Sequence, residues 1–291
     1  MHKTRPAGII ALDLDGTLLN SHKELSRVNL QVLEKAAAKG FAIVPTTGRF
    51  YGGMPDFIKA LPFVDYAITI NGAQVQDLAE QKTVYRAELP WQQAVSIMEW
   101  LDEFPVIYDC YVENDAFMAA ALKEKIDETI HDAHYRKMFH ELRRPVPELK
   151  AYIKELALEN LSVGVQKIQF FTAEPAVRRQ IMEALPRRFE NLAVSSSHVQ
   201  NVEINQSHAN KGEALLALAA YLDVKVDNVY AMGDGLNDLS MIEAAGVGIA
   251  MENACAEVKS AADVITDSCD ADGVAKAIEN YCFKEKAERE I

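Results

Sequence analysis

Apolar and polar residues alternate along the first third of the chain in blocks that predict strands and helices in turn. Residues 8–15 begin with a short apolar run, as expected of a strand that is buried on both faces. Residues 26–40 carry apolar side chains at helical spacing behind Ser26, a residue type that favours helix N-caps. Residues 41–48 and 66–73 predict two further strands, each ending in small polar residues. This strand–helix–strand order is typical of parallel strands joined by crossover helices.

The last third of the chain repeats this alternation, whereas the middle does not. The predicted elements of the last third, helix and strand in turn, are residues 210–224, 228–234, 236–246, 247–251, 256–262, 263–267 and 272–281. The middle mixes strands with amphipathic helices. In one of these helices Trp91, Val95 and Met98 share a face, and this spacing is typical of a stripe buried in a core.

The middle therefore reads as an α+β insert between two halves of one α/β domain. We predict that residues 1–83 and 199–291 form the α/β domain and that residues 84–198 form the insert. A length of 291 residues fits one large domain or two smaller ones. Hydrophobic residues make up 49% of the chain and charged residues 25%, which is ordinary for a protein with a sizeable core.

The net negative charge of the chain disfavours some classes of binding partner on electrostatic grounds. A formal net charge of −13 argues against binding to nucleic acid or to an anionic membrane, because such proteins present basic surfaces. The same charge implies that any anionic substrate needs local positive charge or a metal ion at its site.

Cysteine usage and the N-terminus indicate a cytoplasmic protein. The cysteines, far apart and without a CxxC pair, are Cys110, Cys255, Cys269 and Cys282. In a chain of this length they predict reduced thiols. The apolar stretch behind Lys3 and Arg5 ends at Asp13 and is too short for an export signal. No later stretch has enough continuous apolar residues to span a bilayer.

Polar residues capable of chemistry follow the predicted strands. The residues at these strand ends, with one lysine that begins a predicted helix, are Asp13, Asp15, Thr46 to Arg49, Asn71, Gly72, Gly233, Asp234 and Lys211. Open α/β sheets bind their ligands beyond the carboxyl ends of the strands, so we expect these residues to converge. Converging carboxylates favour a hard cation, and Mg²⁺ suits one or two carboxylates with a substrate phosphate. Each motif alone could be a turn, but agreement among four strand ends exceeds ordinary turn usage.

Four segments occur in one order along the chain: DLDGTLL (13–19), TTGR (46–49), NKGEALL (210–216) and GDGLNDLSMI (233–242). Together they resemble the four-motif signature of the haloacid dehalogenase-like superfamily. The segments DLDGTLLNS, TINGA and GDGLNDLSMIEAAGVGIAMENA resemble the Cof-type phosphatases within it. The resemblance implies a three-layer, doubly wound parallel sheet with an α+β cap domain inserted between the second and third motifs.

The resemblance also implies a covalent mechanism. Asp13 would be the nucleophile that attacks phosphorus and forms a phosphoaspartyl intermediate. Asp15 would protonate the leaving alcohol and later take a proton from the hydrolytic water. Lys211 and Mg²⁺ would keep Asp13 ionised. The metal ligands would be Asp13, the backbone carbonyl of Asp15, and Asp234, with Asp238 supporting them.

The remaining implied contacts serve the phosphoryl group. Thr47 and the amide of Gly48 would donate hydrogen bonds to it, and Lys211 would contribute its charge. Asn237 would reach the phosphate or the attacking groups. Arg49 could be either a structural pairing residue or a pocket residue. The arginine pairs at 143–144, 178–179 and 187–188 could touch an anionic substrate, although surface charge is the simpler interpretation for most of them.

The predicted function is Mg²⁺-dependent hydrolysis of a phosphomonoester, with the insert closing as a lid over the site. A small metabolite is the expected substrate and sugar phosphates are the first candidates, while flavin mononucleotide, pyridoxal phosphate and nucleotides stay open. One alternative is a phosphomutase, which passes the phosphoryl group to a sugar hydroxyl. The other is a non-catalytic sensor of phosphorylated ligands, which would not need an acid/base residue such as Asp15.

Overall fold

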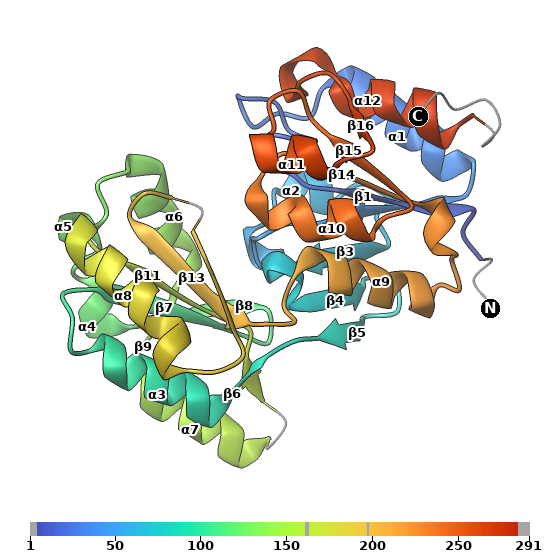
Figure 1. The fold of residues 1–291 in the computed structure, drawn as a ribbon. Coiled ribbons are helices and arrows are strands. Elements are labelled where there is room, and N and C mark those ends of the chain that lie inside the picture. The colour runs from blue at the N-terminus through green and yellow to red at the C-terminus, as the bar shows by residue number, and fades with distance from the viewer. Residues whose placement is uncertain (1–4, 161–162, 197, 285–291) are drawn as a thin grey trace. The chain divides into compact units, whose positions relative to one another are not determined.

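The structure, a computed structural model, describes residues 5–160, 163–196 and 198–284 (Figure 1). Two units divide the chain within these ranges. One, here called the core unit, comprises the described residues 5–49, 54–86 and 210–284. The other, here called the insert unit, comprises Phe50–Gly53 and Ala87–Ala209.

A five-stranded parallel sheet lies at the centre of the core unit. Its strands, in spatial order, are β16 (Val264–Ile265), β15 (Val247–Ala250), β14 (Val229–Gly233), β1 (Gly8–Leu12) and β2 (Phe41–Pro45). Every residue of β1, β14 and β15 is buried, which explains their continuous apolar character. The predicted parallel α/β sheet is confirmed.

The chain leaves the middle of this sheet in two directions. From β1 it runs outward to β2, and from β14 it runs outward to β15 and β16, so β1 and β14 flank a topological switch point. Crossovers between parallel strands are right-handed, so the helices of the two directions cover opposite faces. Accordingly α1 (Arg27–Ala38) packs with α12 (Gly273–Ala277), and α9 (Lys211–Tyr221) packs with α10 (Leu239–Ala244) on the other face (Figure 1). The result is the predicted three-layer, doubly wound arrangement.

The short elements of the core unit complete these layers. They are α2 (Asp56–Lys59), α11 (Ala256–Ala261), η2 (Ile70–Gly72), η3 (Val226–Asn228), η4 (Leu236–Asp238), η5 (Cys269–Ala271) and η6 (Ile278–Cys282). Helix α1 begins where the sequence predicts, because the Ser26 side chain accepts a hydrogen bond from the Asn29 amide.

A small antiparallel sheet extends the core unit beyond β2. It contains β3 (Tyr66–Thr69), β4 (Gln74–Asp77) and β5 (Lys82–Arg86), and Thr46 bridges to Ile68 of β3 in parallel. The hydrophobic pattern predicts β3 but not the hairpin of β4 and β5. Strand β5 also spans the boundary predicted at residues 83 and 84.

The insert unit is an α+β unit with a six-stranded sheet. The sheet order is β12 (Leu192–Ser195), β13 (Asn201–Gln206), β11 (Lys167–Phe171), β7 (Ile107–Val112), β8 (Asp115–Ala119) and β9 (Arg144–Val146). All neighbours pair antiparallel except β8 and β9. The other elements are β6 (Leu89–Pro90), β10 (Gly164–Val165), η1 (Tyr51–Gly53), α3 (Trp91–Leu101), α4 (Ala120–Lys123), α5 (Ile126–Thr129), α6 (Ala133–Leu142), α7 (Leu149–Glu159) and α8 (Pro175–Arg188).

Strand β13 pairs with β11 and β12, although it follows the boundary predicted at residues 198 and 199. The predicted domain boundaries at 83/84 and 198/199 stay a prediction. Within this structure, the units change after Arg86 and after Ala209. Local periodicity does not show which distant strands pair. The sequence pattern therefore gave no sign of a boundary after Arg86 or after Ala209.

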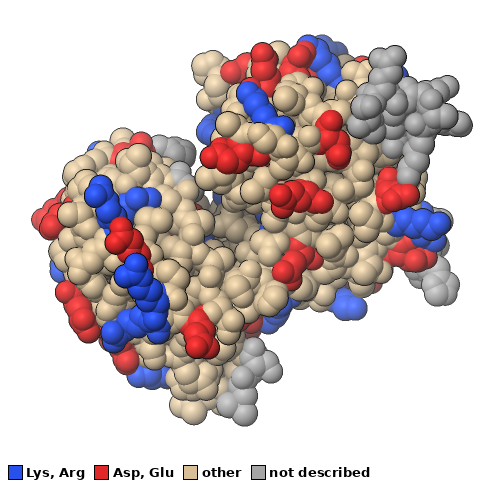
Figure 2. Space-filling model, in the orientation of Figure 1, with Lys and Arg blue, Asp and Glu red and all other residues tan. Residues whose placement is uncertain are grey.

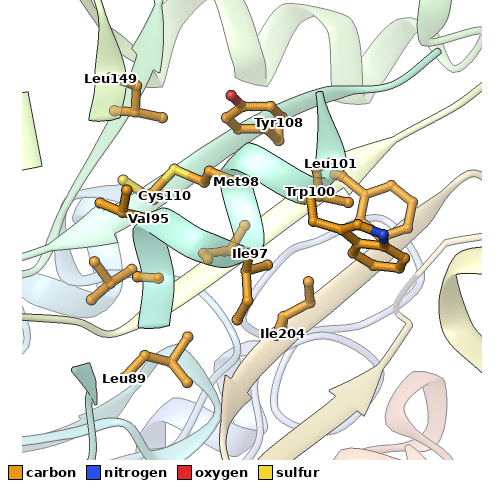
Figure 3. Packing of buried hydrophobic residues seen from close by; sticks show 14 of the residues in the cluster. Leu89, Val95, Ile97, Met98, Trp100, Leu101, Tyr108, Cys110, Leu149 and Ile204 are labelled. Atoms are coloured by element: carbon orange, nitrogen blue, oxygen red, sulfur yellow. The ribbon is translucent and has the colours of Figure 1, made fainter. Parts of the chain in front are cut away.

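The insert unit has its own hydrophobic core. Side chains of α3 pack with β7, α7 and β13, and Figure 3 shows Val95 and Met98 beside Cys110 of β7. Both α3 residues are buried, and Trp91 packs against this cluster while partly exposed. The stripe expected at Trp91, Val95 and Met98 is thus a core stripe.

Arginines of the insert unit differ in their surroundings. Lys and Arg side chains gather over α8 in Figure 2, and this helix carries Arg178, Arg179, Arg187 and Arg188. Arg143 is instead buried and forms an ion pair with Asp109, with 2.6 Å between Nε and Oδ2. Arg143 is therefore an exception to the surface charge expected for most of these arginines.

Two general features complete the description. Among the residues that the structure covers, none of the helices combines the length and apolar character that crossing a membrane requires. The four cysteines all lie in the described ranges and carry free thiols.

Candidate active site

Two aspartates lie close together at the topological switch point between β1 and β14. Asp13 directly follows β1 and Asp234 directly follows β14, and these strands are neighbours in the sheet. The Asp13 amide continues the pairing by donating to the Met232 carbonyl at 3.0 Å. The carboxyl ends of two buried strands therefore bring together residues separated by more than two hundred positions, as the strand-end argument expects.

Asp238 joins these two residues. One oxygen from each of Asp13, Asp234 and Asp238 lies within 4.8 Å of the other two, so the three carboxylates could hold one metal ion. Asp13 is 6% exposed and Asp238 is 1% exposed. Such crowding of buried carboxylates is unfavourable unless positive charge lies nearby.

Lys211 supplies part of that charge. Its Nζ donates to Oδ1 of Asp13 at 2.6 Å and to Oδ1 of Asp238 at 2.5 Å. Lys211 is the first residue of α9 and is completely buried. Helix α9 is capped by Asn210, whose side chain accepts from the Glu213 amide at 2.9 Å, so the helix start holds the lysine in place.

The carboxylates remain crowded despite this lysine. Burial and the charges of Asp238 and Asp234 together raise the pKa of Asp13 to about 8, against the opposing effect of Lys211. Burial and the charge of Asp238 raise the pKa of Asp234 to about 6. Burial disfavours a charged lysine, but the charges of Asp13 and Asp238 raise the pKa of Lys211 above its usual range. A divalent cation fits this donor set, because it would offset the excess of negative charge with oxygen ligands.

Asp238 also organises the loop after β14. Its Oδ2 accepts hydrogen bonds from the amides of Asp234 and Gly235, each at 2.9 Å, while its Oδ1 accepts from Lys211. This carboxylate thus holds the loop that presents Asp234. The motif resemblance implies that Asp238 supports the metal ligands, and its hydrogen bonds to this loop are consistent with that role.

Asp15 points its carboxylate toward positive groups. Arg49 donates from Nε to Oδ2 and from Nη2 to Oδ1, both at 2.9 Å, and Nζ of Lys23 lies 3.0 Å from Oδ1. Burial alone would raise the pKa of Asp15, but Arg49 and Lys23 hold it below its usual value. Of the two interpretations left open for Arg49, pairing is the one seen in this structure.

The predicted phosphoryl-binding residues lie on two loops of the core unit, which carry Thr47 with Gly48 and Asn237, and at the start of α9, which carries Lys211. Thr47 is buried, and its Oγ1 accepts from the Arg49 amide at 3.2 Å, which leaves the hydroxyl hydrogen available to donate. Gly48 faces Asn71, since a Cβ at residue 48 would lie 2.6 Å from Asn71 Oδ1. Asn237 belongs to η4 and donates from Nδ2 to the same Asn71 oxygen at 3.4 Å.

Residues 10–278 match the family described as haloacid dehalogenase-like hydrolase. The chain belongs to the haloacid dehalogenase-like hydrolases. The resemblance inferred from the four motifs is confirmed.

Named relatives of this hydrolase include phosphatases of Bacillus subtilis. The chain is 31% identical over 280 residues to phosphatase YwpJ, a match that covers 92% of this chain and 97% of the relative. It is 30% identical over 277 residues to the 5-amino-6-(5-phospho-D-ribitylamino)uracil phosphatase YcsE, covering 94% and 95% of the two chains. A solved haloacid dehalogenase-like hydrolase from Bacteroides thetaiotaomicron superposes with a TM-score of 0.78 at 27% identity, covering 94% and 98%.

Three residues of this haloacid dehalogenase-like hydrolase complete the site without having been singled out from the sequence. Thr17 Oγ1 donates to Oδ1 of Asp234 at 3.0 Å, Lys23 pairs with Asp15, and Asn253 Nδ2 donates to the Gly16 carbonyl at 2.8 Å. Thr17 lies inside the first motif, so its position offered a signal. Asn253 lies inside the last segment that resembles the Cof-type phosphatases, so it offered a signal as well. Lys23 offered none, because only the folded loop brings it to Asp15.

Proposed function

We propose that this hydrolase is a phosphatase that hydrolyses a small phosphorylated metabolite in a Mg²⁺-dependent reaction through a phosphoaspartyl intermediate. The observation that carries the proposal is the meeting of Asp13, Asp234 and Asp238 around Lys211 at the switch point of the sheet. The phosphatase names of its relatives in the same family support it.

Asp13, Asp234 and the backbone carbonyl of Asp15 would hold the metal, and Asp238 would keep the Asp234 loop in place. Bound Mg²⁺ would neutralise the carboxylates and polarise a phosphoryl oxygen as a Lewis acid. This charge balance also answers the difficulty that a dianionic substrate meets in a chain with a net charge of −13.

In the first step a carboxylate oxygen of Asp13 attacks phosphorus, and the bond from phosphorus to the leaving oxygen breaks. Lys211 stabilises the negative charge of the transferring group, while the Thr47 hydroxyl and the Gly48 amide donate hydrogen bonds to its oxygens. Asp15 gives its proton to the leaving oxygen, so the alcohol departs neutral.

In the second step Asp15, now ionised, removes a proton from water. The resulting oxygen attacks the phosphorus of the aspartyl phosphate, and the bond between phosphorus and Asp13 breaks, which releases inorganic phosphate. The pair with Arg49 suits this step because it favours an ionised Asp15. The first step needs a protonated Asp15, so that pair must loosen before the alcohol leaves.

Sugar phosphates are the first substrate candidates, and an insert that closes as a lid would select among them. One relative is named as a phosphatase of 5-amino-6-(5-phospho-D-ribitylamino)uracil, whose phosphate is carried by a ribityl group. We also propose a cytoplasmic location, which the four free thiols support.

The test is a phosphate-release screen of the full chain over sugar phosphates, flavin mononucleotide, pyridoxal phosphate and nucleotides, with Mg²⁺ or with a chelator. Asp13→Asn serves as the blank. We expect release from at least one compound with Mg²⁺ and loss of that release with the chelator. Isomerised sugar phosphate without release would identify a phosphomutase instead. Binding of substrates without turnover by the folded, Mg²⁺-loaded protein would identify a sensor.

A further inference from the structure

Three consecutive residues after β3 have a left-handed backbone. The φ angles are 55° at Ile70, 57° at Asn71 and 95° at Gly72. A β-branched residue rarely adopts positive φ, and Ile70 does so while completely buried. Strain of this kind persists only where the surrounding structure holds it, and it is common at functional sites. The segment Ile70–Gly72 therefore calls for an explanation beyond a simple turn.

The backbone of this segment is tied to the loop after β2. The Ile70 amide donates to the Arg49 carbonyl at 2.9 Å, and the Asn71 amide donates to the Thr47 carbonyl at 3.1 Å. Thr47 and Gly48 are the proposed donors to the phosphoryl group. The strained segment thus holds the backbone of the proposed phosphoryl-binding turn from both sides of Gly48.

The same segment lies directly against the start of α9. A Cβ at Gly72 would lie 2.2 Å from the Asn210 carbonyl oxygen and 2.8 Å from the Lys211 nitrogen. Only glycine permits this approach at a φ of 95°. The position of Lys211 relative to the strands therefore depends on the path of the chain at Gly72.

The Asn71 side chain joins two loops. Its Oδ1 accepts from Nδ2 of Asn237 at 3.4 Å and lies 2.6 Å from the position that a Cβ of Gly48 would take. Asn71 is 7% exposed, so its carboxamide is confined to this place. Asparagine is also among the few residues that tolerate left-handed backbone. The left-handed backbone of Ile70–Gly72 thus places the Asn71 carboxamide against both Gly48 and Asn237.

We propose that Asn71 is a positioning residue of the phosphoryl site, which orients the Asn237 carboxamide and fixes its distance from the Thr47–Gly48 turn. The inference rests on the proposed function for its effect on turnover. Asn71 acts through the Asn237 carboxamide rather than on the reacting atoms. The competing explanation is that the side chain only stabilises the fold.

Asn71→Gly separates these explanations at the level of the backbone. Glycine adopts a φ of 57° without penalty, so the variant removes the carboxamide and leaves the turn intact. Asn191→Gly is the matched control, because Asn191 has the same φ of 57° but is exposed in the insert unit between α8 and β12. Both variants carry the same gain of freedom in the unfolded chain.

The first measurement is a double-mutant cycle of phosphate release with Mg²⁺. We expect Asn71→Gly to lower kcat/KM about tenfold, mainly through kcat, which is the usual scale for one polar contact. Residues that act as one unit are not additive, so the variant with both Asn71→Gly and Asn237→Ala should be no slower than Asn237→Ala. Fully additive losses, or the same loss in Asn191→Gly, would overturn the proposal.

The second measurement does not depend on turnover. The side-chain amide signals of Asn237 are identified in a two-dimensional ¹⁵N NMR spectrum by their loss in Asn237→Ala. We expect them to shift in Asn71→Gly and to stay in place in Asn191→Gly. Unshifted signals in a folded Asn71→Gly protein would refute the contact. Failure of the wild type to release phosphate, with the shift present, would refute the proposed function but leave the orienting contact established.

Discussion

At the scale of single residues, the site gathers negative charge where burial makes it unfavourable. Burial and the neighbouring carboxylates raise the pKa of Asp13 to about 8 and that of Asp234 to about 6. Lys211 offsets part of this charge through its bonds to Asp13 and Asp238. The rest is the physical reason for expecting a cation. A site with such unfavourable electrostatics lowers the stability of the metal-free protein, and two predictions follow from this.

Replacing Asp13, the proposed nucleophile, should stabilise the metal-free protein in a pH-dependent way. The folded-state pKa of Asp13, about 8, lies above its ordinary value of 3.8. Between these values the folded protein binds more protons than the unfolded chain, so this group's contribution to stability falls as the pH rises. We expect Asp13→Asn to melt above the wild type in EDTA by a larger margin at pH 8 than at pH 5.

Thermal melts at the two pH values check this expectation, and an equal margin at both would contradict it. Each kcal/mol corresponds to a shift of roughly 2–4 °C for a protein of this size class. Phosphate release by the same variant should fall by roughly 10³-fold or more, because a missing nucleophile disables the catalytic unit.

Removing the buried lysine should have the opposite effect on stability. Lys211→Met leaves Asp13 and Asp238 buried without their common partner. We expect the free energy of unfolding in EDTA to fall by about 3–5 kcal/mol, the range for breaking a buried ion pair. Urea denaturation measures it. Lys35→Met is the control, since Lys35 is exposed and its Nζ lies 3.7 Å from Oε1 of Glu279. The urea midpoint of this variant should barely change, because an exposed ion pair contributes little to stability.

At the scale of elements, the ends of β1 and β14 determine where the chemistry can occur. The chain turns away from this pair of strands in both directions, which leaves space beyond their carboxyl ends for the loops that carry Asp13 and Asp234. The segment Ile70–Gly72 directly follows β3. It connects the end of that strand to the site through its contacts with Thr47, Asn210 and Asn237.

Two glycines with similar backbones should respond differently to alanine. Gly40 and Gly72 have φ angles of 87° and 95°, but the atom nearest to an added Cβ lies 3.8 Å away at Gly40 and 2.2 Å away at Gly72. Gly40→Ala should lose about 1–2 kcal/mol, the penalty of left-handed backbone alone. Gly72→Ala should lose at least about 1 kcal/mol more, because the backbone of Asn210 has to shift.

Urea denaturation compares the two glycine variants. Phosphate release should also drop in Gly72→Ala and stay near the wild type in Gly40→Ala, since only residue 72 lies against the helix that carries Lys211. Equal losses of stability in the two variants would show that contact with α9 does not matter.

At the scale of the whole molecule, two units have separate sheets and separate cores. The carboxylates of the proposed metal site, Asp13, Asp234 and Asp238, belong to the core unit, whereas the cluster around α3 belongs to the insert unit. Substitutions in the core of the insert unit should therefore change stability without changing metal affinity.

Leu101→Ala tests this separation. Leu101 is completely buried in the cluster of Figure 3, so its truncation should lower the free energy of unfolding by about 2–5 kcal/mol. The dissociation constant for Mg²⁺, measured by calorimetry, should stay within about twofold because the ligands lie in the other unit. A tenfold weaker affinity in the folded variant would show that the two units share one metal site energetically.

Much of the fold was predictable from local patterns. The continuous apolar runs identified β1, β2, β14 and β15, and Ser26 marked the start of α1. The hairpin of β4 and β5 was not predictable, and neither was the place of β13 in the sheet of the insert unit. Strands that mix polar and apolar residues resemble loops in a sequence pattern. The candidate site was predictable as a set of strand-end residues, since parallel strands place their carboxyl ends at one edge.

By itself, the sequence determined the residue types of the site, the strands that carry them and the family to which the chain belongs. Only the tertiary structure decided which side chains pair: Arg49 with Asp15 and Asn71 with Asn237 in the core unit, and Arg143 with Asp109 in the insert unit. The physical reason is that periodicity reports whether a side chain is buried, whereas the identity of its neighbour depends on how distant segments pack.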